Sequence, residues 1–259
     1  MVRPLTRPIP FIMPCLNRFD MFTETVETID TPIIPIIIDC WRNNRGVSGA
    51  WNEGMKRALA MGERYAVISN DDLKYTPGSL YGIFETLIDS GVSMVSANQL
   101  RLPKRDSQYV QQGVRVGADM FCFAVDIEQL TEVAGWFDEN FFPAYFEDND
   151  MHRRMMISGL ESYINTDHIV IHEGSMTQKF NRHDPNVPTE RFEAHRGYFM
   201  RKWGGNPEEA TFQTPFNEPG LTVRDWYDSM MLDGLETSPA QDILDSIDSK
   251  CYNTMYEQY

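Results

Sequence analysis

The sequence predicts an α/β protein made of one main domain and a C-terminal extension. Over the first two thirds of the chain, short β-rich runs alternate with segments of helical spacing, an order typical of layered α/β proteins. The 259 residues can bury one sizeable core. The hydrophobic share of 42% and the aromatic share of 12% are those of a folded protein. We expect the main domain over residues 1–205 and an acidic extension over residues 206–259.

Short runs rich in apolar and β-branched residues predict the strands. The run at 33–38 predicts a buried strand that ends at Asp39, and the run at 65–69 predicts another that stops at Asn70-Asp71-Asp72. The other strands are expected at 8–13, 92–97, 120–125 and 169–172.

Apolar residues at helical spacing predict the elements between the strands. Trp51, Met55 and Leu59 recur every four residues, which predicts a helix with Ser48 as its cap. Gly91 and Gly159 are each placed to end a helix in the left-handed conformation. The helices are expected at 18–29, 48–61, 77–89, 126–134, 149–158 and 192–203.

The net charge of −15 restricts the classes of partner. Surplus acid lies mostly after Pro207, where Arg224 and Lys250 are the only lysine or arginine residues. Nonspecific attraction to nucleic acid needs the opposite sign, so nucleic acid is not expected as a partner. A small anionic ligand would need a metal ion or local cations.

The cysteines and the apolar runs indicate the compartment. Four scattered cysteines without a CxxC pair suit a reducing environment. The longest apolar run is far below the about 20 residues of a membrane helix, and the start of the chain lacks the apolar region of a signal peptide. We therefore expect a cytoplasmic protein with no transmembrane segment.

Polar residues follow two of the expected strands. In an open α/β sheet, ligands gather at the carboxyl ends of the strands, where Asp39 and Asn70-Asp71-Asp72 are expected. Carboxylates there can hold Mg²⁺ or Mn²⁺ and so neutralise a diphosphate. The alternative is a simple turn, because Asn and Asp accept turn geometry.

A glycine-rich stretch runs from Asn44 to Gly54. Its glycines allow close backbone approach at a helix start, where phosphate or polar ligands are favoured. It lacks the Gly-Lys-Ser/Thr of a Walker loop and is not a dinucleotide fingerprint. A well-packed junction between a loop and a helix is the structural alternative.

The stretch FEDNDMHRRMMISGL, residues 146–160, places three carboxylates within four positions. Asp148 or Asn149 could cap the following helix, which accounts for one or two of the acids. Aromatic residues just before them predict a partly desolvated wall, where clustered carboxylates need a cation or a shared proton. One of them could serve as a general base toward a sugar acceptor.

His172 lies at an expected strand end and could complete a mixed oxygen and nitrogen metal shell with Asp72. A hydrogen-bonded structural histidine is the alternative. His183 is a weaker candidate in a loop.

Together these stretches resemble the GT-A glycosyltransferases of family 2, especially the rhamnosyltransferase-like and galactofuranosyltransferase-like branch, over about residues 8–175. Asn70-Asp71-Asp72 resembles the Asp-x-Asp-like triplet of the family, and its Asn70 departs from a strict Asp-x-Asp. Trp136, Met151 and one extra residue before Phe142 depart from the family's later block. The family's loop is matched by Asn44, Gly46, Gly49, Asn52 and Gly54, and its later block by Gly135, Phe137, Asp138, Glu139, Phe142, Glu147, Asp148, Asp150, Arg154 and Gly159.

The resemblance implies a hexosyl- or pentosyltransferase of the GT-A fold, with a nucleotide-diphosphate sugar donor, Mn²⁺ or Mg²⁺ and an unidentified acceptor. Asp72 and His172 would bind the metal ion, and Asp148 would be the base of an inverting reaction. Glu147 would bind acceptor hydroxyls, while Asp150 and Arg154 would position Asp148. The donor site would include Asp39 near the nucleoside, together with Asn44, Gly46, Asn52, Asn70 and Asp71.

Two other functions remain open from the sequence. A catalytically silent sugar-nucleotide-binding or scaffold protein could keep the same fold. A nucleotidyltransferase would share the sheet and the metal ion, but the segment 8–18 lacks its glycine-rich basic loop. The tail is expected to form either an amphipathic arm packed on the body or a docking segment for a partner or for a homo-oligomer.

Overall fold

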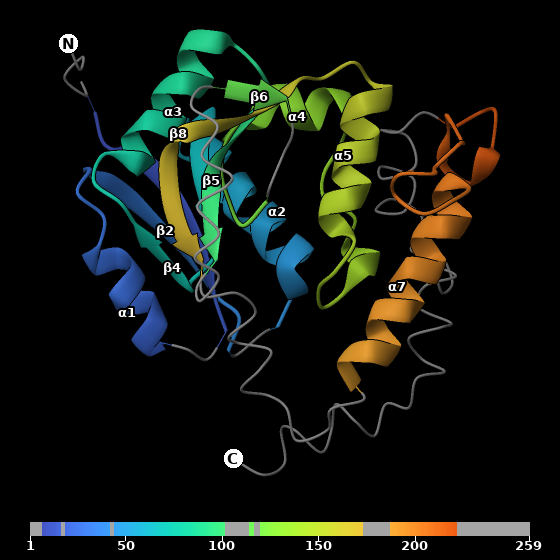
Figure 1. Ribbon diagram of the computed structural model, residues 1–259, viewed down its shortest axis with the longest axis horizontal. Helices are drawn as coiled ribbons and strands as arrows, with labels where there is room; N and C mark the ends of the chain where they lie inside the picture. Colours follow the sequence, from blue (N-terminus) through green and yellow to red (C-terminus); the bar gives the residue numbers. More distant parts are fainter. Residues whose placement is uncertain are drawn as a thin grey trace.

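The computed structural model describes residues 7–16, 19–41, 44–101, 114–116, 120–172 and 187–221. These residues form one mixed sheet with helices on both faces (Figure 1). The strands are β1 (Ile9–Cys15), β2 (Ile33–Asp39), β3 (Tyr65–Ser69), β4 (Leu73–Tyr75), β5 (Met94–Arg101), β6 (Val114–Val116), β7 (Cys122–Asp126) and β8 (Ser162–His172). The helices are α1 (Phe19–Glu27), α2 (Gly46–Ala60), α3 (Ser79–Ser90), α4 (Ile127–Val133), α5 (Glu147–Ile157) and α7 (Val187–Trp203), with short 3-10 turns η2 (Glu139–Phe141) and η3 (Pro215–Asn217).

The strand directions bring five carboxyl ends to one edge of the sheet. The strand order is β2-β1-β3-β7-β5-β8-β4, and β6 pairs with β8. β1 is parallel to β2 and β3, and β5 is parallel to β8. β7 is antiparallel to both β3 and β5, so these two strands run the same way. The ends of β1, β2, β3, β5 and β8 therefore share an edge, which is called the carboxyl edge below.

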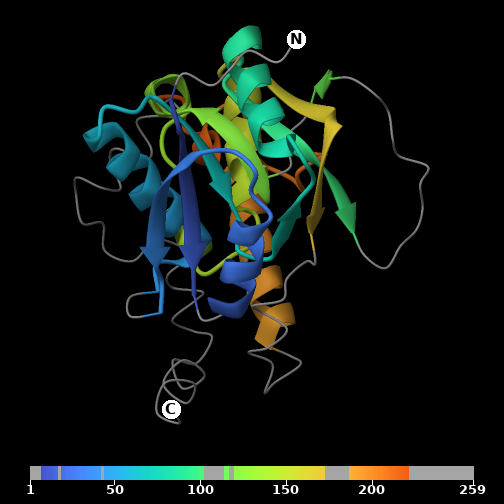
Figure 2. The same ribbon diagram turned by 90° about the vertical axis from the view of Figure 1, so that its left-hand side faces the viewer.

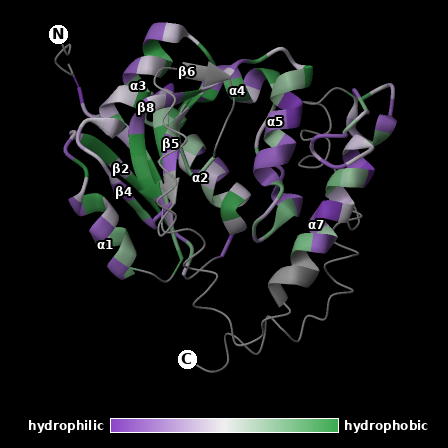
Figure 3. Ribbon diagram, in the orientation of Figure 1, coloured by the Kyte–Doolittle hydropathy of each residue, from purple (hydrophilic) through white to green (hydrophobic). Residues whose placement is uncertain are grey.

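Apolar side chains bury both faces of the sheet. On one face, α2, α4 and α5 pack against β1, β2, β3 and β7. On the other face, α1 and α3 cover β1, β3, β5 and β7 (Figure 2). Hydrophobic residues dominate strands such as β2, whereas β5 is partly hydrophilic (Figure 3). This three-layer arrangement confirms the α/β fold class expected from the sequence.

A third apolar cluster attaches α7 to the loop before α5. Tyr198, Phe199 and Trp203 of α7 pack with Phe141 and Phe146. Figure 1 shows α7 beside α5, on the side of α5 that faces away from the sheet. Residues beyond position 205 also contact these elements: the Phe212 carbonyl accepts a hydrogen bond from Arg153, and Phe216 packs on the cluster.

The expected boundary at residue 205 stays a prediction, and the tail at 222–259 lies outside the described residues. Within the described part of the chain, no helix has both the length and the apolar character needed to cross a membrane.

Most element boundaries fall within a few residues of the expected ones, and two expected caps are wrong. Ser48 lies inside α2, which begins at Gly46 after Arg45. The fifth helix begins at Glu147 after Phe146, so neither Asp148 nor Asn149 is its cap. Gly91 and Gly159 do end their helices in the left-handed conformation, with φ of 70° and 72°. The strand expected at 169–172 is longer, and β4 and β6 were not expected.

Candidate functional site

Five of the expected site residues lie at the carboxyl edge. Asp39 is the last residue of β2 and is exposed, and Asn70-Asp71-Asp72 follows the end of β3. His172 is the last residue of β8. Three segments far apart in the sequence thus meet at one edge, as the strand directions require.

Asp72 and His172 are in direct contact. β4 runs antiparallel to β8 with Leu73 opposite His172, which places the residue before Leu73 next to the histidine. The Nε2 atom of His172 lies 3.1 Å from Oδ1 of Asp72. Both side chains are buried, with 9% and 6% of their surface exposed. A carboxylate oxygen and an imidazole nitrogen at this distance form a mixed pair of potential metal ligands.

The turn that carries Asp71 and Asp72 is held by α1. The buried Thr25 hydroxyl lies 2.9 Å from the Asp71 carbonyl oxygen and 2.8 Å from that of Leu73, and it accepts a hydrogen bond from the Leu73 amide. Burial, followed by the negative charge of Asp71, raises the pKa of the Cys15 thiol to about 12. The Cys15 thiol is therefore neutral, and it lines this site rather than acting as a nucleophile.

The glycine-rich stretch connects the carboxyl edge to the loop before α5. Asn44 accepts a hydrogen bond from the Gly46 amide, and the Val47 amide donates one to the Pro143 carbonyl over 2.8 Å. Gly46 has a φ of 66°, and a Cβ atom there would meet the Pro143 carbonyl and the Phe142 ring. Only glycine fits this position without strain. The contact fixes the loop against the start of α2.

The Asn52 side chain connects α2 to Phe137 and Glu139 inside the protein. Its amide donates to the Phe137 carbonyl and to Glu139, and its oxygen accepts from the Phe137 amide. The side chain is fully buried. The structure therefore does not bring Asn52 to the surface of the carboxyl edge with the other expected donor-binding residues.

Asp148 is exposed in the first turn of α5, and its Oδ1 accepts a hydrogen bond from the Asn149 amide (2.8 Å). Tyr145 and Phe146 precede this turn with φ values of 85° and 71°. Such conformations cost non-glycine residues energy and are typical of functional loops. Figure 1 shows this end of α5 on the same side of the molecule as the carboxyl ends of β5 and β8. The start of α5, which carries Asp148, and the end of β8, which carries His172, thus lie on the same side of the molecule.

Glu147 differs sharply from its neighbour. It is only 8% exposed, and burial, followed by the negative charge of Asp148, raises its pKa to about 8. Among the described residues, its Oε2 atom has no hydrogen-bond partner. Ionised carboxylates clustered beside aromatic side chains are unfavourable. At neutral pH a proton on Glu147 removes one of these negative charges.

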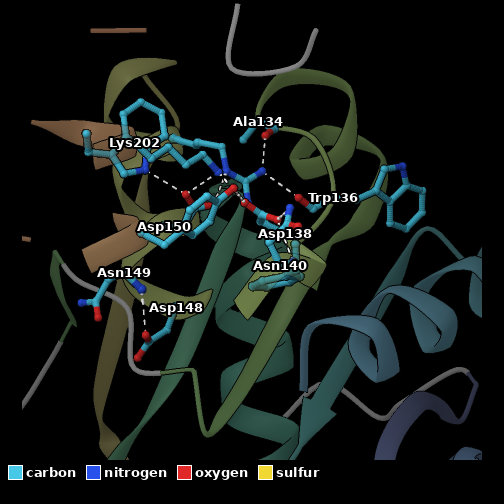
Figure 4. Close-up of polar contacts among 12 residues, drawn as sticks. Ala134, Trp136, Asp138, Asn140, Asp148, Asn149, Asp150 and Lys202 are labelled. Carbon is cyan, nitrogen blue, oxygen red and sulfur yellow. Dashed lines mark hydrogen bonds and ion pairs between the residues drawn. The ribbon is translucent and has the colours of Figure 1, made fainter. Parts of the chain in front are cut away.

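Asp150 and Arg154 belong to a buried polar network that also includes Asp138 and Lys202 (Figure 4). Lys202 lies 2.7 Å from a carboxylate oxygen of each aspartate. Arg154 donates to Asp150 and to the Ala134 and Trp136 carbonyls. Burial alone would raise the pKa of Asp138, but the Lys202 ammonium holds it below its ordinary value.

This network stabilises α5 on the side that faces α7. Figure 4 shows Asp148 apart from it, in contact with Asn149, while Asp150 faces Lys202. Lys202 was not expected from the sequence, because a lysine in the last turn of a helix usually lies at the surface. His183, the weaker histidine candidate, lies outside the described residues.

The donor set fits a divalent cation only in part. Within the described part of the chain, no group of three or more His, Cys, Asp or Glu side chains is placed to hold a metal ion. Asp72 and His172 could supply two ligands of the types that Mn²⁺ accepts. The remaining positions would fall to water and to a ligand that brings its own oxygen atoms.

Comparisons with known proteins identify the fold. No family model matches the chain, and a search of curated proteins gave no match. Among solved structures, the mannosyltransferase PcManGT from Pyrobaculum calidifontis, in complex with GDP-Man and Mn²⁺, matches with a TM-score of 0.54 and 13% identity, over 96% of this chain and 84% of that one. S. aureus TarS 1–349 matches with a TM-score of 0.50 and 10% identity, over 76% and 74%; its complex with UDP-GlcNAc gives 0.50 and 9%, over 78% and 74%. The chain therefore has a fold of the GT-A glycosyltransferase type.

Proposed function

We propose that this protein is a glycosyltransferase that moves a sugar from a nucleotide-diphosphate donor to an acceptor hydroxyl. The observation that carries the proposal is the contact between Asp72 and His172 at the carboxyl edge. Ligands of open α/β sheets bind at this edge. The nucleotide sugars in the PcManGT and TarS complexes support the same class of donor.

The donor would lie along the carboxyl edge. Asp39 would contact the nucleoside, and Asn44, Gly46, Asn70 and Asp71 would surround the remainder of the donor. Asp72 and His172 would hold Mn²⁺ or Mg²⁺, and such a cation would offset the negative charge of the diphosphate. This charge compensation is needed because the chain has a net charge of −15.

The acceptor would approach from the α5 side. Asp148 would take the proton of the acceptor hydroxyl while that oxygen bonds to the anomeric carbon and the bond from this carbon to the diphosphate oxygen breaks. One displacement of this kind inverts the configuration. Glu147, neutral below pH 8 or so, would donate a hydrogen bond to the acceptor and leave Asp148 as the charged member of the pair. Asp150 and Arg154 would hold the helix that presents both.

The test is nucleotide release from a panel of UDP and GDP sugars with Mn²⁺, with and without candidate acceptors. Asp148→Asn should lower turnover by at least about 100-fold, within the range typical of a lost general acid–base group, and Asp72→Ala should also lower turnover, because it removes a ligand of the cation that offsets the diphosphate charge. Asp89→Asn is the matched control, because Asp89 is exposed at the end of α3, at the opposite edge of the sheet.

Full turnover by both site variants would contradict the assigned roles. Donor binding without turnover over the whole panel would instead indicate a sugar-nucleotide-binding protein.

A further inference from the structure

The His172 ring is held from three sides. Its Nε2 atom faces Asp72, and its Nδ1 atom lies 2.6 Å from the amide nitrogen of Gln99. The Phe121 ring stacks on its face, with centroids 5.2 Å apart and planes within 13° of each other. The ring therefore has one fixed orientation, and the open question is which of its two nitrogens carries the proton.

Gln99 reaches His172 because of the strand register. On the parallel pair β5 and β8, Gln99 lies opposite Val170, and His172 is two residues further along β8. Side chains two residues apart on a strand share a face, so Gln99 and His172 are diagonal neighbours. Neither residue type nor spacing in the sequence singles out Gln99.

The contacts favour one tautomer of His172. In the orientation that the structure gives the Gln99 amide, its nitrogen faces Nδ1 and can only donate, so Nδ1 accepts from Gln99 and the ring proton lies on Nε2, facing the Asp72 carboxylate. In this tautomer the Nε2 atom has no lone pair to offer a metal ion.

We propose that Gln99 is a positioning residue that switches His172 between a resting and a metal-binding tautomer, an inference that rests on the proposed metal site. When the Gln99 amide rotates by half a turn, its oxygen replaces its nitrogen and accepts a hydrogen bond from Nδ1. One proton leaves Nε2 for water and one from water joins Nδ1, so the charge of the ring is unchanged. The Nε2 lone pair then points toward Asp72 and can bind the cation.

The amide is the chemical group that this switch requires. An amide can donate or accept at the same place, whereas a carboxylate only accepts and an alkyl group does neither. Partners of this kind, behind a metal-binding histidine, fix its tautomer, and losing them weakens metal binding by about 10- to 100-fold. Gln99→Glu should hold the metal-binding tautomer permanently, and Gln99→Leu should leave Nδ1 without a protein partner at that position.

Two measurements test the proposal. The first is ¹⁵N NMR of the His172 ring without metal: we expect the proton on Nε2 in the wild type and on Nδ1 in Gln99→Glu. The second is binding of Mn²⁺ alone, followed by electron paramagnetic resonance: we expect Gln99→Leu to bind at least about 10-fold more weakly and Gln99→Glu at least as tightly as the wild type. Asn98 is the neighbour of Gln99 on β5, so Asn98→Leu is the matched control and should bind Mn²⁺ as tightly as the wild type.

The outcomes distinguish a failure of this inference from a failure of the proposed function. Unchanged Mn²⁺ binding in Gln99→Leu, equal losses in Gln99→Leu and Gln99→Glu, or the wild-type tautomer in Gln99→Glu would overturn the role of Gln99. His172→Ala and Asp72→Ala test the metal site itself. If both bind Mn²⁺ as the wild type does, the metal site is wrongly placed and the proposed function fails with it.

Discussion

Replacing Glu147 with glutamine should make the protein less sensitive to alkaline pH. The Glu147 carboxyl is buried, its Oε2 atom has no hydrogen-bond partner among the described residues, and its pKa is raised to about 8 by burial and then by Asp148. The folded protein therefore holds this proton more tightly than the unfolded chain, in which the carboxyl has its ordinary pKa of 4.5. Stability from this group is complete below pH 4.5 and is lost as the pH rises toward 8.

The size of the effect follows from these two pKa values. The difference, 8 − 4.5, is 3.5, and each pKa unit corresponds to about 1.4 kcal/mol. Part of the change falls outside the range between pH 5 and pH 8, so the wild type should lose on the order of 3 kcal/mol of unfolding free energy relative to Glu147→Gln over that range. Glutamine keeps the shape of the side chain and carries no titrating proton.

Urea unfolding at pH 5 and pH 8 measures this difference. Other titrating groups cancel when the two proteins are compared at the same pH. Glu208→Gln, at an exposed position after α7, is the control and should follow the wild type at both pH values. If Glu147→Gln and the wild type lost the same stability between pH 5 and pH 8, Glu147 would not be a buried neutral acid.

Two further substitutions test the packing behind the site. Lys202→Met should lower the unfolding free energy by about 3–5 kcal/mol because it leaves the buried Asp138 and Asp150 carboxylates without their shared cation; a midpoint of urea unfolding near that of the wild type would contradict this. Gly54→Ala should destabilise by about 1–3 kcal/mol, although alanine favours helices, because the new methyl group would overlap the buried Ile12 side chain; thermal unfolding measures it, and a stabilised variant would show that α2 can move away from β1.

The outline of the fold was accessible from the sequence because local patterns encode it. Apolar runs and glycine stops predicted the strands and helices of the sheet, and their carboxyl ends placed Asp39, Asp72 and His172 at one edge. β4 was missed because three residues after a turn carry no periodic signal. β8 was predicted too short because Asn165, Thr166 and Asp167 interrupt its apolar pattern.

The supporting residues could not be predicted, because their roles depend on contacts between distant segments. Lys202 resembles a surface lysine until α7 packs it between two aspartates from the α5 side. Thr25 and Gln99 have ordinary surroundings in the sequence, and only the register of the elements brings them to the Asp71 carbonyl and to His172. Asn52 matched a family position, but its buried bracing contacts appear only in the folded chain.

Calorimetric titration with UDP and with GDP, in Mn²⁺ and in EDTA, tests most directly whether Asp72 and His172 form a cation-dependent diphosphate site. The two protein ligands would leave the rest of the cation's coordination to the nucleotide, so at least one nucleotide should bind in Mn²⁺ and lose that binding in EDTA or in Asp72→Ala. Equal affinity in Mn²⁺, in EDTA and in Asp72→Ala would show that the diphosphate is held elsewhere and would contradict the account.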